Sequence, residues 1–190
     1  MKKLTRYLLA HYGGKAVVKS EVSKACKLFN SNPDATINFM ISYGYFVRVL
    51  RGLYYVKTLE EFTLKKAVDV YKTLFLGLNK LKVNWYFGLY TALRLNGLTH
   101  EFSGTIFVVN DKIYRAKEIK VAGEKVKFIK LAHRLVNFGV VNSEEKRFSD
   151  VDKTILDLVY ISRYRSVPEG KIVVLIDEYK KRLSLSKLKS

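Results

Sequence analysis

The chain has 190 residues, and a composition of 48% hydrophobic and 27% charged residues is typical of a globular protein, not a disordered one. Lys and Arg number 35 against 17 Asp and Glu, and this net charge of +18 favours a polyanionic partner, either nucleic acid or an anionic membrane surface. Because Cys26 is the only cysteine and no apolar run is long enough to span a membrane, the sequence excludes an internal disulfide and a transmembrane helix. We expect a cytoplasmic protein without a signal peptide.

Three short helices are predicted at the start of the chain. Apolar residues at helical spacing predict the first over 4–11, and two glycines follow it. The second begins at Ser20, the expected N-cap, and its apolar stripe places Cys26 in the core. The third runs over 33–43, with Asn32 as its cap and a proline at its first position.

A basic β-hairpin is predicted directly after these helices. Two arms rich in β-branched and aromatic residues flank Arg51 and Gly52. Residues 1–58 hold ten basic and two acidic side chains, so this third of the chain carries almost half of the net charge. Helices followed by such a hairpin are typical of a winged helix-turn-helix, whose third helix enters the major groove of DNA. We therefore predict a DNA-binding domain over 1–58.

The expected DNA contacts are polar side chains on the second helix, the third helix and the hairpin: Lys19, Ser20, Lys24, Asp34, Asn38, Ser42, Arg48 and Arg51. At the start of the second helix, backbone amides and the helix dipole also favour phosphate. On the third helix, the amide of Asn38 can pair with an adenine edge, and Asp34 can accept from a cytosine amine or orient a neighbour. Arg51 can bind phosphate or enter a narrow minor groove. Simple solvent exposure is the alternative for each.

Several tyrosines crowd the predicted hairpin. Interleaved with basic residues, such rings can stack on the bases of a single strand. Tyrosines more often pack a small hairpin onto its helices, and we expect packing for most of these four: Tyr43, Tyr45, Tyr54 and Tyr55.

A second domain over 59–190 is expected to contain helices and an antiparallel sheet. Three runs of strand-like period between 104 and 131, separated by turn residues, predict a three-stranded meander packed on helices. One further strand is expected around 138–141. The predicted helices of this domain occupy 59–80, 85–96, 150–164 and 168–182. The predicted fold class is thus α+β, with a winged helix-turn-helix followed by an α/β domain.

No catalytic constellation is found in the sequence. It has neither a P-loop nor a dinucleotide-binding glycine pattern, and its three histidines lack the spacing of metal ligands. Asp150 and Asp152 form a D-x-D pair, which can hold Mg²⁺ for nucleotidyl transfer. Acids at a helix start also complement the helix dipole, and we favour this second interpretation. The sequence therefore predicts a protein that is not an enzyme and has no catalytic residues, metal or cofactor.

Three stretches of the chain resemble the AbiEi family, the antitoxin half of the AbiE abortive-infection (type IV) toxin–antitoxin systems. They are YGYFVRVLRGLYYV over 43–56, WYFGLYTALRLNGLTH over 85–100 and FSDVDKTILDLVYI over 148–161. The resemblance implies an N-terminal winged helix that binds and represses the promoter of its own operon. It also implies a C-terminal domain that counters a nucleotidyltransferase-like toxin without a stable complex. The chain is short for this family.

The expected function is therefore transcriptional repression in antiviral defence, with operator duplex DNA as the partner and a homodimer on paired half-sites. One alternative is an RNA- or single-strand-binding module, whose contacts come from lysines of the predicted meander: Lys112, Lys117, Lys120, Lys125, Lys127 and Lys130. A nucleotidyltransferase using Asp150 and Asp152 is a third hypothesis. Membrane attachment is not expected, because no predicted helix pairs a fully apolar face with a lysine-only face.

Overall fold

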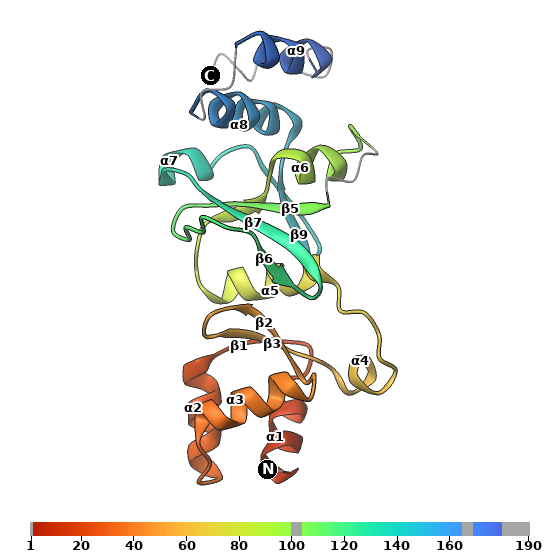
Figure 1. Ribbon diagram of the computed structural model, residues 1–190, viewed down its shortest axis with the longest axis vertical. Coiled ribbons are helices and arrows are strands. Elements are labelled where there is room, and N and C mark those ends of the chain that lie inside the picture. The colour runs from red at the N-terminus through yellow and green to blue at the C-terminus, as the bar shows by residue number, and fades with distance from the viewer. Residues whose placement is uncertain (1, 100–103, 165–168, 180–190) are drawn as a thin grey trace. The chain divides into compact units, whose positions relative to one another are not determined.

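The protein is a mixed α+β molecule with two separate sheets (Figure 1). The computed structural model describes residues 2–99, 104–164 and 169–179. His100 and the tail after Tyr179 lie outside the described residues. None of the described helices has the length and apolar character needed to cross a membrane.

The chain divides into two compact units. The first comprises Met1–Lys82 with Lys120–Glu124, and the second Val83–Ile119 with Lys125–Ser190. The first unit therefore extends beyond the 1–58 expected for the N-terminal domain. The extension includes the helix α5 (Val70–Lys80), which packs on the sheet of the first unit.

Three helices and three strands form the body of the first unit, in the order α1, β1, α2, α3, β2, β3. The strands form an antiparallel sheet in the order β1-β3-β2. Their bounds are Lys2–Tyr12 for α1, Ala16–Val18 for β1, Lys19–Leu28 for α2, Pro33–Ser42 for α3, Phe46–Leu50 for β2 and Leu53–Val56 for β3. The three helices and the hairpin were predicted, and β1 was not.

The caps of α2 and α3 explain where these helices begin. The Asn32 side chain accepts a hydrogen bond of 3.0 Å from the Ala35 amide, which confirms Asn32 as the cap of α3. Ser20 does not cap α2, because the helix begins one residue before it. The cap position belongs to Val18, whose amide donates to the Glu21 carboxylate at 3.0 Å.

Both faces of the three-stranded sheet are covered. On one face, side chains of α1, α2 and α3 form a core with Phe46, Tyr54 and Val56, and Cys26 is fully buried in it as predicted. On the other face lies α5 (Figure 1). A Cβ at Gly77 would lie 3.1 Å from Val49, so α5 approaches the sheet closely there.

The predicted helix over 59–80 is two helices in the structure. The short α4 (Leu59–Thr63) ends before α5 begins. Lys65 between them has a φ of +51°, which a helix cannot accommodate. Asp69 then accepts a hydrogen bond of 2.7 Å from the Tyr71 amide and so caps α5. A periodic apolar pattern continued across this break, and for that reason the prediction missed it.

The second sheet is a six-stranded mixed sheet in the order β6-β7-β5-β4-β9-β8; apart from Lys120 and Val121 of β6 and Glu124 of β7, it belongs to the second unit (Figure 1). Its strands are β4 (Trp85–Phe87), β5 (Thr105–Asn110), β6 (Ile119–Val121), β7 (Glu124–Lys130), β8 (Val140–Ser143) and β9 (Lys146–Ser149). The helices of the second unit are α6 (Leu89–Leu95), α7 (His133–Val136), α8 (Val151–Tyr164) and α9 (Glu169–Tyr179), of which α6 and α8 pack on the sheet.

The predicted three-stranded antiparallel meander is wrong. Strands β5 and β7 are hydrogen-bonded in parallel, with Ile106 opposite Val126 and Val108 opposite Phe128. The segment between them includes β6 and turns the chain back so that β7 runs in the direction of β5. Strand period in the sequence reports side-chain alternation and not strand direction, so it could not distinguish the two arrangements.

The predicted helix over 85–96 is wrong in its first third, where the structure has β4 and the helix α6 begins only at Leu89. The break lies at Gly88, and a Cβ there would lie 2.6 Å from the Val109 side chain. Only glycine allows this close approach of the chain to β5. By contrast, α8 occupies the predicted range, and the Asp150 carboxylate caps it by accepting from the Lys153 amide at 2.8 Å.

Candidate nucleic-acid interface

All eight predicted DNA contacts are exposed side chains of the first unit. They lie on three elements: the beginning of α2, the outer face of α3 and the hairpin formed by β2 and β3. The inner face of α3 is buried through Thr36, Ile37 and Met40. The solvent-facing row of α3 is therefore available to a partner, and it consists of Asp34, Asn38 and Ser42, as the spacing predicted.

An ion pair joins the beginnings of α2 and α3. Lys19 Nζ donates to Asp34 Oδ1 at 2.6 Å. Both side chains are at least half exposed, so the pair contributes at most about 1 kcal/mol to stability. A phosphate can therefore compete with Asp34 for Lys19 at little cost. The pair also keeps the Asp34 carboxylate from facing a duplex as an uncompensated charge.

A backbone hydrogen bond brings the hairpin tip to the same place. The Lys19 amide donates to the Gly52 carbonyl oxygen at 2.8 Å. Gly52 has a φ of +80°, a conformation in which glycine carries no steric penalty. The tip with Arg51 is thereby fixed beside the beginning of α2. The ion pair with Asp34 and the hydrogen bond with Gly52 make Lys19 a junction between α2, α3 and the hairpin. The candidate interface is defined here as the eight exposed residues that this junction brings together.

The junction also changes one expectation about phosphate binding at α2. The first amides of this helix were expected to be open to phosphate. Instead the Val18 amide donates to Glu21 and the Lys19 amide donates to Gly52. Phosphate binding at this end therefore depends on the side chains of Lys19, Ser20 and Lys24 and not on these two amides.

The negative charge of Glu21, at the beginning of α2, is neutralised by an ion pair within the first unit. Lys80 Nζ donates to Glu21 Oε1 at 2.6 Å. Burial acts to raise the pKa of Glu21, but the hydrogen bonds from Lys80 and from the Val18 amide outweigh it and lower the pKa below its usual value. Glu21 is thus ionised and paired, so it does not oppose the cations of the interface.

Two arginines extend the candidate interface along the hairpin. Arg48 lies directly opposite Tyr54, so the two side chains share the face of the sheet that carries α1, α2 and α3. Arg51 lies in the turn after β2. Within the described part of the chain, neither guanidinium has a hydrogen bond or an ion pair, and both are exposed. Each can therefore bind a phosphate with both of its parallel N–H groups.

The tyrosines of the hairpin behave largely as predicted. Tyr54 and Tyr55 are buried, and the half-buried Tyr45 stacks on Phe62 with ring centroids 4.2 Å apart. Tyr43 is the exception, because its side chain is 62% exposed at the end of α3. One side of this ring packs against Phe39, with ring centroids 4.3 Å apart, and its exposed side makes it a further candidate contact next to the polar row of α3. In the sequence, only the position of Tyr43 directly after Ser42, the last polar residue of the exposed row of α3, could have indicated its exposure.

The D-x-D pair does not form an open metal site. Asp150 caps α8, and Asp152 is buried. Within the described ranges, no group of three or more His, Cys, Asp or Glu side chains could hold a metal ion. The polar residues of this region instead form a buried cluster, in which Lys153 Nζ donates to Asp157 and the Tyr86 hydroxyl donates to Asp157 Oδ2 at 2.6 Å. Sequence inspection did not identify this cluster.

Comparison with protein-family models finds no match, and comparison with curated proteins finds no relative. Functional inference for this chain therefore depends on its own residues and geometry.

Proposed function

We propose that the chain is a sequence-specific DNA-binding protein whose first unit is a winged helix. The order α1-β1-α2-α3-β2-β3 with the sheet order β1-β3-β2 supports this proposal, because it is the topology expected of that fold. In the proposed complex α3 enters the major groove and the hairpin lies on the adjacent backbone. The observation that carries the proposal is the junction at Lys19, which fixes the ends of α2, α3 and the hairpin on one exposed surface.

The charges of this surface suit separate roles for α3 and for the cations around it. Within α3 there is no lysine or arginine, so its polar row offers hydrogen bonds to base edges. The surrounding cations supply contacts to phosphate, which provide most of the affinity without sequence preference. Neutralising roughly 4–6 phosphates per protomer corresponds to a slope of about −4 to −5 when log K is plotted against log salt.

The proposed biological role is that of a repressor of its own operon with an antitoxin function. The resemblance of residues 43–56, 85–100 and 148–161 to the AbiEi family supports this part of the proposal. In this role the second unit counters a nucleotidyltransferase-like toxin without a stable complex, and two copies of the chain bind paired half-sites. The protein itself needs no catalytic residues for either task.

The direct test is a binding titration of the full chain with a fluorescent duplex from the DNA upstream of its gene. We expect saturable binding, the stated salt slope, and competition by unlabelled duplex in preference to single-stranded RNA of equal length. A nearly flat salt response, or better competition by the RNA, would contradict the proposal. The second outcome would favour a single-strand-binding module.

Substitution of Asn38 tests the assignment of α3 as the reading helix. Asn38→Ala is expected to relax the preference at one base pair, with a loss of about 1–3 kcal/mol for the preferred sequence and almost none for the others. The measurement is binding to a set of duplexes that vary one base pair at a time. Lys117→Ala, an exposed substitution in the second unit, is the control. Equal loss for every sequence would show that another element reads the bases.

A further inference from the structure

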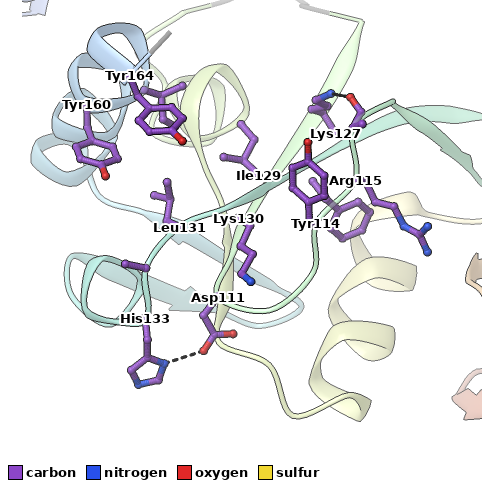
Figure 2. Close-up of a pocket in the computed structure, with 14 residues that line it drawn as sticks. Asp111, Tyr114, Arg115, Lys127, Ile129, Lys130, Leu131, His133, Tyr160 and Tyr164 are labelled. Carbon is purple, nitrogen blue, oxygen red and sulfur yellow. Dashed lines mark hydrogen bonds and ion pairs between the residues drawn. The ribbon is translucent and has the colours of Figure 1, made fainter.

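The second unit contains a pocket of about 760 Å³ that the proposed function does not use (Figure 2). Its volume lies in the range of small-molecule sites. Three tyrosines and three cations contribute to its lining: Tyr114, Tyr160, Tyr164, Arg115, Lys127 and Lys130. Ile129 near the end of β7 and Leu131 just after this strand lie between the tyrosines of α8 and Tyr114 (Figure 2).

The tyrosines form two aromatic walls. Tyr160 and Tyr164 are one helical turn apart on α8, so they lie on the same face of that helix. Tyr114 comes from the segment after β5 and stands across the pocket from them (Figure 2). These rings are 47%, 83% and 72% exposed, respectively. Three large exposed rings around one hollow offer stacking surfaces to a planar ligand.

The charges of the lining favour an anion. Arg115 and Lys130 are exposed; Lys130 extends from β7 toward Asp111, and Arg115 extends in a different direction, past Tyr114 (Figure 2). Lys127 is half-buried, and its ammonium donates to the carbonyl oxygen of Ala116 on the rim. Asp111 is the only carboxylate among the described residues of the lining, which leaves this part of the lining with an excess of positive charge.

Asp111 is committed to neighbouring side chains and is not open to a ligand. Its carboxylate accepts from Asn84 at 2.9 Å and lies 2.8 Å from His133 Nδ1, and its side chain is 2% exposed. Burial acts to raise the pKa of Asp111, but the hydrogen bonds from His133 and Asn84 outweigh it and lower the pKa. The carboxylate thus joins the segment after β5 to α7 and leaves the exposed cations free to bind an external anion.

We propose that this pocket binds a nucleotide unit, with the base stacked against the tyrosines and the phosphate held by Lys130. The ligand is either a free nucleotide or one nucleotide of a single strand, since both present a planar base and a phosphate. The site lies in the second unit and shares no residue with the candidate DNA interface. A negative result for this pocket would therefore not contradict the proposed DNA binding.

Calorimetric titration of the full chain tests the proposal with four probes: adenosine monophosphate, adenosine, ribose 5-phosphate and a ten-nucleotide single-stranded RNA. We expect adenosine monophosphate to bind at least tenfold more tightly than adenosine or ribose 5-phosphate, because only it offers both chemical groups. If the RNA binds more tightly than adenosine monophosphate, the ligand of the pocket is one nucleotide of a single strand. If the RNA binds equally or more weakly, the ligand is a free nucleotide.

Matched variants locate the binding. Tyr160→Ala is expected to weaken binding at least fivefold, whereas Tyr90→Ala, an equally exposed tyrosine on α6, leaves it unchanged. Lys130→Ala is expected to abolish the tighter binding of adenosine monophosphate relative to adenosine. Lys125→Ala, on the same strand, is expected to preserve it. All four residues are surface positions, and thermal melting of each variant verifies folding. Absence of binding by every probe up to the millimolar range, or binding that both test variants retain in full, would overturn the proposal.

Discussion

Replacement of Arg48 and Arg51 together by alanine is expected to weaken duplex binding about 100-fold, equally for preferred and unrelated sequences. Each guanidinium is exposed and without an internal partner in the described structure, so each is available for a phosphate. A charge-assisted contact of this kind contributes about 1.5 kcal/mol, which is roughly tenfold in affinity. Loss of two phosphate contacts also lowers the magnitude of the salt slope by about 2.

Two further double variants distinguish contacts made by the hairpin arginines from attraction by the total positive charge of the protein. The pair Lys117→Ala and Lys125→Ala removes the same charge from the second unit. The pair Arg48→Lys and Arg51→Lys keeps the charge of the hairpin but loses the planar fork of the guanidinium. We expect the first pair to have little effect and the second an intermediate one. If the control pair weakened binding as much as the alanine pair on the hairpin, total charge and not the interface would explain the affinity.

Lys153→Met is expected to lower the free energy of unfolding by about 3–5 kcal/mol. Lys153 and Asp157 are almost completely buried on α8, and their charges compensate each other. The Lys153 ammonium also lies 4.5 Å from the ring centroid of Phe138. Removal of the lysine leaves a carboxylate in an apolar environment with only the Tyr86 hydroxyl as a described partner. An uncompensated buried charge has a cost of this size.

A double variant and the pH dependence test this explanation. Lys153→Met with Asp157→Leu should be more stable than Lys153→Met alone, because no charge remains buried. Burial raises the pKa of Asp157 even though Lys153 and Tyr86 act to lower it. Without Lys153 this pKa rises further, so the instability of the single variant grows as the pH rises above the usual carboxyl range and shrinks as Asp157 is protonated. Urea denaturation at several pH values measures both effects. A loss below about 1 kcal/mol at neutral pH would show that the pair is not a compensated ion pair.

The local elements of the first unit could largely be predicted from the sequence. Asn32 and Pro33 carry the signals of a helix start in adjacent positions, and α3 begins there. The turn at Gly52 joins two strands of strong β-propensity, as expected. Strand β1 escaped prediction because three residues are too few to show a period, and only pairing with β3 stabilises them as a strand.

Features that depend on distant parts of the chain could not be predicted. The ion pair between Lys19 and Asp34 spans 15 residues, and the hydrogen bond between Tyr86 and Asp157 spans 71. Strand direction likewise depends on the path of the segment between β5 and β7 and not on either strand. The pocket gathers the segment after β5, the end of β7 and the last turns of α8, so no local pattern indicated it.

Hydrogen–deuterium exchange of the full chain, with and without its upstream duplex, tests most directly whether α2, α3 and the hairpin form the DNA-binding surface. We predict slower exchange on binding in peptides that cover residues 19–24 and 33–52, and no change over 105–133. Protection confined to the second unit, with residues 33–52 unaffected, would contradict the assignment.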